Sequence, residues 1–351
     1  MPGSERVSLA ACPAYAVEGV EAALRRLLAP LGGMGAFVAP GQKVVLKPNL
    51  LRAAPPETAI TTHPALVTAV ARLVHEVGGE PFILDSPGGP TSAPYMMAVY
   101  RATGMVEAAE AGGATLISRI HSTQVPVRAG LILQHVDLVR EALEADVLIN
   151  LPKLKTHGLT GMSVAVKNLF GLVPGTTKVV YHRRLANPPA MARGFLDIAA
   201  TAGAALHIVD AVIGMEGNGP SAGNPRSIGA LVAGSDPLAV DIVSAALVGH
   251  RPMEKLPIRL AVEAGLTTGR VADLELLGDS LEHLAVTRFR LPDAYRADSA
   301  RRRSFLARWT SDRTRPEQPP VTLSASTQCT GCGLCARHCP ASAIVIADGR
   351  A

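Results

Sequence analysis

The sequence has 351 residues and a formal net charge of +5, and 48% of its residues are hydrophobic but only 3% aromatic. Its length predicts two domains, or one large domain with a small appendage. The scarcity of aromatic side chains argues against stacking on nucleic-acid bases, and the mild charge comes mainly from arginines at 301–303 and in the tail that follows, not from a long basic face.

Short apolar runs alternate with helical patterns along the first 250 residues. The expected strands cover 44–46, 82–85, 114–117, 146–150, 206–213 and 230–233. The expected helices cover 66–77, 95–111, a helix that ends at 141–145, and 236–248. The strands are continuously apolar, which is typical of strands buried on both faces. The pattern therefore predicts an α/β fold with a mostly parallel sheet and helices on both faces.

Polar motifs follow the expected strands, at 47–49, 85–86, 150–157 and 216–218. The carboxyl ends of parallel strands meet at one edge of a sheet, where ligands bind. We expect 150–157 to leave its strand and enter a polar loop. The glycine-rich patterns of standard nucleotide-binding loops are missing from the sequence, so the motifs do not indicate a nucleotide site of that kind.

Lysine is rare in this chain, which has 7 lysines and 27 arginines, yet four of the lysines lie between Lys153 and Lys178. Lysine is a compact, strongly hydrated point charge, whereas arginine is a planar fork. Lysines that persist in an arginine-rich chain indicate a site that requires them, and converging lysines suit a carboxylate or phosphate ligand. The alternative is chance clustering of ordinary solvated charge.

The motifs supply the candidate site residues. The unperturbed pKa of histidine lies near neutrality, so His157 is a candidate proton donor, unless it only satisfies a backbone carbonyl. His157, Lys155 and Glu216 form the candidate catalytic set. The candidate ligand-binding residues are Lys47, Asn49, Lys153, Lys167, Asn168, Asn218 and Asp241.

Two carboxylates of this set have more than one interpretation. Glu216 lies in the glycine-rich segment 214–220, whose glycines either let the backbone approach a ligand or only shape a turn. Asp241 lies inside a helix, where we expect it to pair with a loop lysine or to bind a metal. Because converging ammonium groups repel each other, we expect an anion, or Glu216 or Asp241, among the lysines.

The C-terminal cysteines indicate a cofactor. Cys329, Cys332, Cys335 and Cys339, followed by Pro340, form a C-x2-C-x2-C-x3-C-P run, the bacterial signature of an iron–sulfur cluster. Zinc sites usually pair two C-x2-C units across a long spacer, so three thiols at steps of three disfavour zinc. The run therefore predicts an iron–sulfur cluster, with the 4Fe-4S type favoured.

The fourth ligand of this cluster is an open question. In two-cluster ferredoxins the fourth cysteine of such a run ligates the other cluster. The sequence has no second run, its fifth cysteine is the distant Cys12, and a strand at 343–346 with a turn at 348–349 resembles the first half of a two-cluster module. Either Cys339 closes the cluster, or another chain supplies a ligand, or the cluster has three irons, or the gene product is truncated.

Several of these motifs resemble those of the domain-of-unknown-function family 362, whose members often carry a C-terminal ferredoxin-type segment. The resemblance covers residues 40–250 and the cysteine run, and it is carried by 47–49, 150–157, 167–171, 216–220 and 235–241. It implies an α/β domain and iron–sulfur binding but no particular activity. Many relatives have two cysteine runs, whereas this chain has one.

We therefore expect three parts: an α/β domain with an anion-binding site at 1–297, a linker rich in Arg, Ser and Pro at 298–320, and a ferredoxin-type iron–sulfur segment at 321–351. The leading hypothesis is an iron–sulfur redox protein that relays electrons to a small anionic substrate or cofactor in the α/β domain. One alternative is an electron-transfer or maturation partner without its own small substrate. Another is a non-redox binding protein or enzyme with a structural cluster.

The expected partners are the anionic ligand and a redox partner protein, with no nucleic acid and no membrane, and a homo-oligomer is compatible with the sequence. Four of the five cysteines lie in one metal motif, which fits a reducing compartment. Residues 1–30 lack the features of a signal peptide, and no apolar run approaches the roughly 18 residues that a membrane span needs. We therefore expect a cytoplasmic protein.

Overall fold

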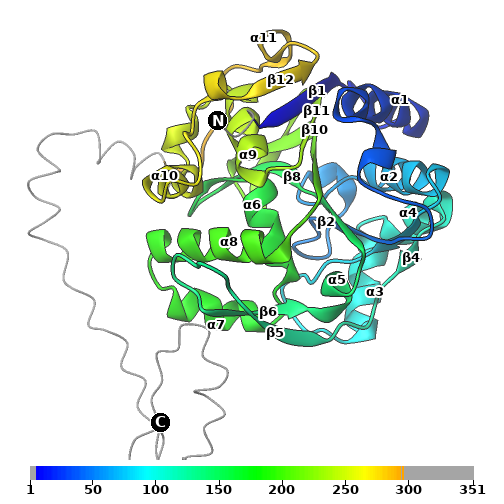
Figure 1. The fold of residues 1–351 in the computed structure, drawn as a ribbon, viewed down its shortest axis with the longest axis horizontal. Coiled ribbons are helices and arrows are strands. Elements are labelled where there is room, and N and C mark those ends of the chain that lie inside the picture. The colour runs from blue at the N-terminus through cyan, green and yellow to red at the C-terminus, as the bar shows by residue number, and fades with distance from the viewer. Residues whose placement is uncertain (1–4, 294, 296–351) are drawn as a thin grey trace, which may run out of the picture.

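One central sheet with helices on both faces forms the part of the chain that the computed structural model describes, residues 5–293 and 295 (Figure 1). The strands of the sheet follow the order β12-β1-β11-β10-β7-β2-β3-β4, and β8 and β9 join it beside β10. Their bounds are β1 Arg6–Ala11, β2 Lys43–Pro48, β3 Glu80–Ile83, β4 Thr115–Leu116, β7 Val147–Leu151, β8 Lys153–His157, β9 Gly161–Ser163, β10 Leu206–Asn218, β11 Ala222–Gly234 and β12 Glu275–Gly278. The expected linker at 298–320 and the cysteine run lie outside the described residues.

The centre of the sheet is parallel. Strand β7 pairs in parallel with both β2 and β10, and β3 and β4 continue the parallel array to one edge. Strand β11 is antiparallel to β10 and to β1, while β12 is parallel to β1. Strands β5 (Ser122–Pro126) and β6 (His135–Val139) form a separate antiparallel ribbon. The chain therefore has an α/β fold with a mostly parallel sheet, which confirms the predicted fold class.

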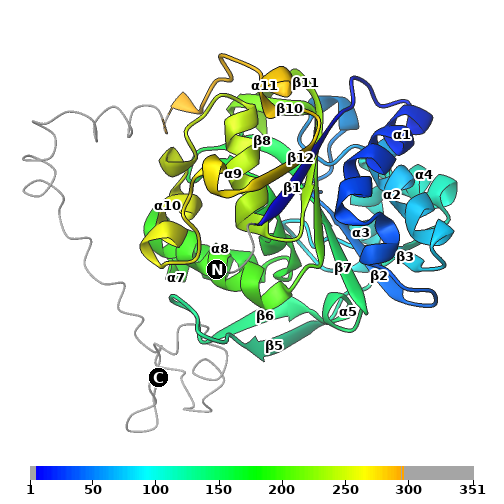
Figure 2. The ribbon, with the colours of Figure 1, turned by 45° about the horizontal axis from the view of Figure 1, so that its top comes forward.

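Helices cover the two faces of this sheet, as Figure 2 shows with α1 and α2 on one side and α8, α9 and α10 on the other. The first group comprises α1 Val17–Leu28, α2 Pro64–Glu76, α3 Ala93–Ala102 and α4 Met105–Gly112. The second group comprises α6 Ala165–Asn168, α7 Thr177–Arg184, α8 Pro188–Ala202, α9 Pro237–Leu247, α10 Leu256–Glu263 and α11 Leu281–Leu284, and the short α5 Arg140–Leu143 precedes β7. Among the described residues, no helix combines the length and the apolar character that crossing a membrane requires.

Successive side chains of each strand point to opposite faces of the sheet, and each face has its own hydrophobic core. In β2, Val44 and Leu46 belong to the core under α1–α4, whereas Val45 packs with residues of α8 and α10. In β10, Ile208 belongs to the first core and Val209 to the core under α9. Successive side chains of a strand point to opposite faces, so a strand covered on both sides must be apolar at every position.

Three local expectations were wrong. The helix expected at 95–111 is two helices, α3 and α4, because Gly104 between them has a left-handed φ of 71°. The loop expected at 150–157 contains strand β8, which pairs with β10. The turn expected at 214–220 is mostly the end of β10, which pairs with β11 as far as Asn218. In the last two cases, sheet hydrogen bonds outweigh the turn signals of polar residues and glycine.

Candidate functional site

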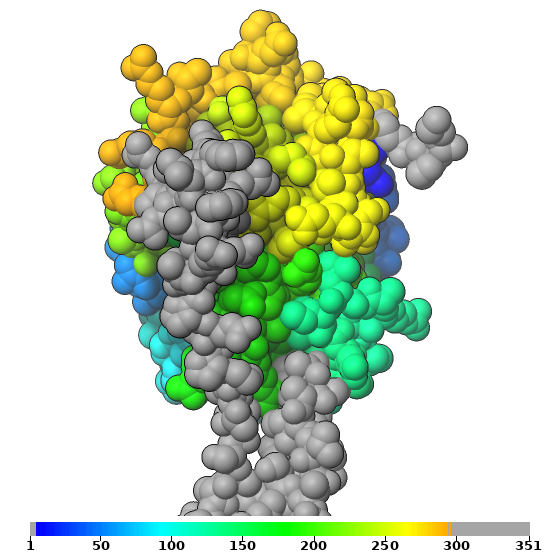
Figure 3. All heavy atoms as spheres, turned by 90° about the vertical axis from the view of Figure 1, so that its left-hand side faces the viewer, coloured from blue at the N-terminus to red at the C-terminus, as the bar shows by residue number. Residues whose placement is uncertain are grey.

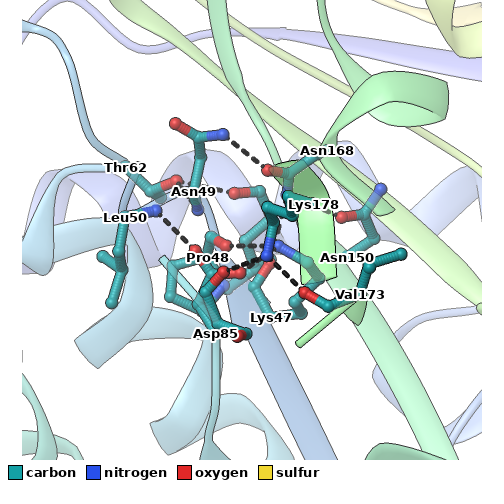
Figure 4. A network of polar contacts seen from close by, with 12 residues as sticks. Lys47, Pro48, Asn49, Leu50, Thr62, Asp85, Asn150, Asn168, Val173 and Lys178 are labelled. Carbon is teal, nitrogen blue, oxygen red and sulfur yellow. Dashed lines mark hydrogen bonds and ion pairs between the residues drawn. The ribbon is translucent and has the colours of Figure 1, made fainter. Parts of the chain in front are cut away.

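A buried lysine–aspartate pair lies at the carboxyl ends of β2 and β3 (Figure 4). Lys47 donates from Nζ to Asp85 Oδ1 at 2.6 Å, and the other Asp85 oxygen accepts the Leu50 amide hydrogen at 2.8 Å. Lys47 is 0% exposed and Asp85 is 2% exposed. At such burial each charge needs its partner, because a lone ion away from water is very costly.

A second buried pair joins β8 to β10. Lys153 Nζ lies 2.9 Å from Asp210 Oδ2 and 2.8 Å from the Tyr15 hydroxyl oxygen. Asp210 also accepts from the Tyr15 hydroxyl at 2.6 Å and from the His63 amide at 2.8 Å. Burial lowers the pKa of Lys153, and the charge of Asp210 opposes that shift. The pair fixes β8, and therefore fixes Lys155, which lies two residues further on the same face of the strand.

A chain of side-chain amides leads from Lys155 into the sheet. Lys155 Nζ donates to Asn49 Oδ1 at 2.6 Å. Asn49 then donates to Asn168 at 2.7 Å, and Asn168 donates to Asn150 at 2.8 Å. The chain ends where the Asn150 amide nitrogen lies 2.9 Å from His207 Nδ1. Because each amide has its donor and acceptor engaged, the network holds the Lys155 side chain in one position.

Further basic groups surround a pair of aromatic rings on the α6–α8 side. The rings of Phe170 and Phe195 pack with their centroids 5.0 Å apart. Lys167 Nζ lies 5.2 Å from the Phe195 centroid, and Lys178 Nζ lies 5.8 Å from the Phe170 centroid. The His182 ring meets Phe170 edge-on, with centroids 5.7 Å apart. Aromatic faces attract cations without neutralising them, so these groups keep their charge available.

Burial and mutual repulsion lower the pKa of the basic groups that lack a carboxylate partner. The pKa of Lys167 falls to about 8 through burial first and then through the charge of Lys47. Burial lowers the pKa of Lys178 to about 7, and Lys167 adds repulsion. Burial, followed by the charge of Lys167, also holds the pKa of Lys155 and of His157 well below the ordinary range. Bound negative charge would raise all of these pKa values again.

The structure brings together seven of the sequence-predicted residues at the carboxyl edge of the sheet: Lys47, Asn49, Lys153, Lys155, His157, Lys167 and Asn168. It places two others elsewhere. Glu216 accepts hydrogen bonds from the backbone and guanidinium of Arg290, and Asn218 is hydrogen-bonded to Asp293. Met215 lies opposite Lys155 in the sheet, so the neighbouring Glu216 projects from the other face of β10.

Asp241 neither pairs with a loop lysine nor joins a metal-binding group, in contrast to the expectation. Its Oδ1 accepts the Ala165 amide hydrogen at 2.6 Å, at the start of α6. Burial raises the pKa of Asp241 to about 8, although the amides of Ala165 and Val166 oppose the shift. Since α6 carries Lys167, the bond from the Ala165 amide to Asp241 helps to position that lysine through the start of the helix. Among the described residues, no group of three or more His, Cys, Asp or Glu side chains is arranged to hold a metal ion.

Gly171 is required by the close approach of the chain to the Lys47–Asp85 pair. A Cβ atom at Gly171 would lie 2.4 Å from Asp85 Oδ1 and 2.4 Å from Lys47 Nζ. We expect Gly171→Ala to lower the free energy of unfolding by about 1–3 kcal/mol, because the buried pair must shift. Gly158, where a Cβ would meet nothing within 4 Å, is the matched control, and Gly158→Ala should stay within about 0.5 kcal/mol. Urea unfolding checks both, and equal effects would contradict this account of Gly171.

Lys255 carries a buried ammonium outside the lysine site. It is 2% exposed, and its Nζ has no hydrogen-bond acceptor within residues 5–293 and 295. Burial lowers the pKa of Lys255 from 10.5 to about 8, and Glu254 opposes the shift. We expect Lys255→Met to stabilise the fold at pH 7 by about 1–3 kcal/mol, since it removes a buried charge that, within the described residues, has the Tyr295 ring 5.8 Å away but no hydrogen-bond acceptor.

The pH dependence of this gain has a defined sign. Between pH 8 and 10.5 the unfolded chain holds the Lys255 proton while the folded chain releases it, so the wild-type protein gains stability as the pH rises. The advantage of Lys255→Met should therefore be full below pH 8 and vanish toward pH 10.5. Urea unfolding at pH 7, 9 and 10.5 measures it, and a pH-independent difference would contradict the assigned cause.

Four residues that build the site escaped the sequence-based candidate list: Asp85, Asp210, Tyr15 and Asn150. Asp210 carried a usable signal, because an aspartate in the middle of an apolar strand must find a partner. Asp85 and Asn150 stand at strand ends and belonged to the polar motifs. The contact of Tyr15 with Lys153 spans 138 residues of sequence, and no local pattern announces it.

Comparison with known proteins places the chain in a family. Residues 44–246 match the family described as "Domain of unknown function (DUF362)", and residues 326–345 match a 4Fe-4S binding domain. The chain is 38% identical over 295 residues to the "Thylakoid-associated protein sll1697" of Synechocystis sp., and the match covers 82% of this chain and 88% of that protein.

A solved structure, the lactate racemase apoprotein from Thermoanaerobacterium thermosaccharolyticum, has a TM-score of 0.38 and 14% sequence identity to this chain. The match covers 67% of this chain and 54% of that one, so the chain spans about half of its length. A likeness this slight carries nothing about activity. The match over 44–246 spans the strands and loops that form the lysine site, and the 4Fe-4S match supports an iron–sulfur cluster in the cysteine segment. The chain therefore belongs to the DUF362 family and carries a 4Fe-4S binding segment at its C-terminal end.

Proposed function

We propose that the chain is a cytoplasmic iron–sulfur redox protein that passes electrons from its C-terminal segment to a small anionic substrate or cofactor in the α/β domain. An iron–sulfur cluster supplies one-electron transfer, and the thiolates that would hold it are those of Cys329, Cys332, Cys335 and Cys339. A redox partner protein would deliver the electrons. The observation that carries the proposal is the group of lysines gathered at the ligand-binding edge of the sheet, in a chain that also has a 4Fe-4S segment.

The chemistry of the edge residues fits a ligand that gains electrons and protons. Burial lowers the pKa of Lys155 and of His157, and a bound anion would raise both again, so each group can take up a proton when the ligand binds. The lysine–aspartate pairs of Lys47 and Lys153 hold the strands that carry these groups. The remaining ammonium groups favour a negatively charged ligand, because in its absence they repel one another.

The test is anaerobic purification of the full chain, followed by iron and sulfide analysis, EPR of the reduced protein, and mass spectrometry of small molecules released by heating. We expect iron, sulfide, an EPR signal in the reduced state and a released anion that is missing from Lys155→Ala. A redox-active protein with no released small molecule would favour the electron carrier or maturation partner instead. A cluster that cannot be reduced would favour a structural role and overturn the proposal.

A further inference from the structure

The charges at the carboxyl edge fall into two groups. Lys47 is paired with Asp85 and Lys153 with Asp210, each at salt-bridge distance and each almost fully buried. These two lysines are therefore already neutralised by the protein, and an anion placed beside them would also meet a carboxylate. The repulsion from that carboxylate cancels much of the attraction of the lysine.

The second group lies between β8, α6 and α7. Among the described residues, Lys155 and Lys178 donate hydrogen bonds to neutral oxygens alone, namely Asn49 Oδ1 and backbone carbonyls such as that of Ser86. The Lys167 ammonium has neither a hydrogen-bond acceptor nor a carboxylate partner among the described residues, and it lies 5.2 Å from the centroid of the Phe195 ring. This side of the molecule, with α7 and α8 in green below α10 in yellow, faces the viewer in Figure 3.

His157 completes the second group. It ends β8, two residues beyond Lys155 on the same face of the strand, and Lys155 and Lys167 both act on its charge. The Leu159 amide lies 3.2 Å from His157 Nδ1 and donates to it. A neutral imidazole that accepts at Nδ1 carries its proton on Nε2, so the free edge of the ring is a hydrogen-bond donor. Asn49 accepts from Lys155 Nζ and donates to Asn168, the neighbour of Lys167, so β8 and α6 bring Lys155, His157 and Lys167 to the same part of the sheet edge.

We propose that Lys155, His157 and Lys167 form an oxyanion subsite that binds the anionic group of the ligand, a carboxylate or a phosphate, while the pairs of Lys47 and Lys153 serve as its scaffold. The inference rests on the proposed function, because it names the part of that site which holds the ligand's charge. Lys167 and His157 are partly exposed to solvent, whereas Lys155 is 1% exposed.

Binding at this subsite is linked to protonation. The titratable groups whose charge interacts with that of Lys167 lie on β2, β8 and α7, and all of them are basic. They are Lys47, Lys155, His157, Lys178 and His182. Asp85 opposes the lowering of the pKa of Lys47, Lys155 and Lys178. The pKa of Lys167 is about 8, so the amine is partly deprotonated at pH 8. An anion stabilises its charged form, and binding therefore takes up protons.

The test is titration calorimetry of the full-length, anaerobically prepared protein with sodium sulfate and with sodium malonate at pH 8, in two buffers that differ in ionisation enthalpy. Neither anion changes its own protonation near that pH, so a buffer-dependent heat reports protons taken up by the protein. We expect saturable binding with net proton uptake. Sulfate alone would assign a phosphate-like ligand and malonate alone a carboxylate, and either result supports the subsite.

The variants make the assignment specific. Lys167→Met should weaken binding by about tenfold, because it removes one nearby cation from a partly buried site, and Lys167→Arg should retain binding. Lys255→Met is the matched control, since it removes another lysine whose pKa burial lowers to about 8, and it should change binding less than twofold. If Lys167→Met does not fold, His157→Gln replaces it, with an expected loss of about fivefold.

Two results would overturn the inference: no saturable binding of either anion to the wild-type protein, or equal losses for Lys167→Met and Lys255→Met. Failure of the subsite is distinguishable from failure of the proposed function. A reducible cluster in a protein that binds neither anion rejects the subsite alone. Specific anion binding in a protein whose cluster cannot be reduced rejects the redox proposal alone.

Discussion

Asp210→Ala should lower the free energy of unfolding by about 3–5 kcal/mol, which is the range for removing one member of a buried ion pair. Asp210 is 0% exposed and accepts hydrogen bonds from Lys153, from the Tyr15 hydroxyl and from the His63 amide. The substitution leaves all three donors without this acceptor, and one of them is a buried ammonium. Urea unfolding followed by far-ultraviolet circular dichroism measures the loss.

A double-mutant cycle separates the ion pair from the packing around it. Once Asp210 is gone, Lys153→Met removes an unpaired charge, so it should cost less in the Asp210→Ala background than in the wild-type protein. Glu263→Ala is the surface control, because the Glu263 side chain is 54% exposed and its carboxylate lies 3.7 Å from Arg193. It should change stability by less than about 0.5 kcal/mol. Strict additivity in the cycle would show that the pair contributes nothing specific.

Cys332→Ser should abolish cluster binding and reduce the iron content from about four atoms per chain to background, since a serine hydroxyl does not replace the cysteine thiolate as an iron ligand. Iron and sulfide analysis after anaerobic reconstitution measures this directly. Cys339→Ser tests whether the four cysteines of the run are sufficient to bind the cluster. Loss of the cluster in this variant assigns Cys339 as the fourth ligand, and an intact cluster means that the site is completed elsewhere.

Cys12→Ser is the control for these variants, and it should leave the cluster spectrum unchanged. Cys12 is 1% exposed in the core under α1–α4, and its Sγ lies 3.6 Å from the Ala14 carbonyl oxygen. Burial raises the pKa of this thiol, and the charge of Asp210 adds to the shift, so the thiolate that a metal needs is disfavoured. Loss of the cluster in Cys12→Ser would instead make Cys12 the missing ligand.

The sequence predicted the sheet well because its strands are buried on both faces. Val44 and Leu46 point to one face of the sheet and Val45 to the other, and both faces are buried, so all three residues are apolar. Such continuous apolar runs can be recognised from the sequence alone. The polar motifs 47–49, 85–86 and 150–157 do meet at the shared carboxyl edge, whereas 216–218 does not, because Glu216 and Asn218 bond to Arg290 and Asp293 instead. The rarity of lysine then drew attention to Lys155 and Lys167.

The failures have a common physical cause. Strand β8 was expected as a loop, because two lysines in a five-residue segment look solvated. They are buried because Lys153 meets Asp210 and Lys155 meets Asn49, and both contacts join residues more than fifty positions apart. Asp241 was expected near the lysines, but its carboxylate holds the start of α6 instead. Partners this distant in sequence are set by the fold and leave no local pattern.

The most direct test of the redox proposal is an EPR measurement on the anaerobically reduced full chain, before and after addition of the small-molecule fraction released from the purified protein by heating. If the chain passes electrons to an anion in the α/β domain, the signal of the reduced cluster should disappear on addition to the wild-type protein and persist in Lys155→Ala. A signal that persists in the wild-type protein, or disappears equally in both, would contradict electron transfer to a ligand at the lysine site.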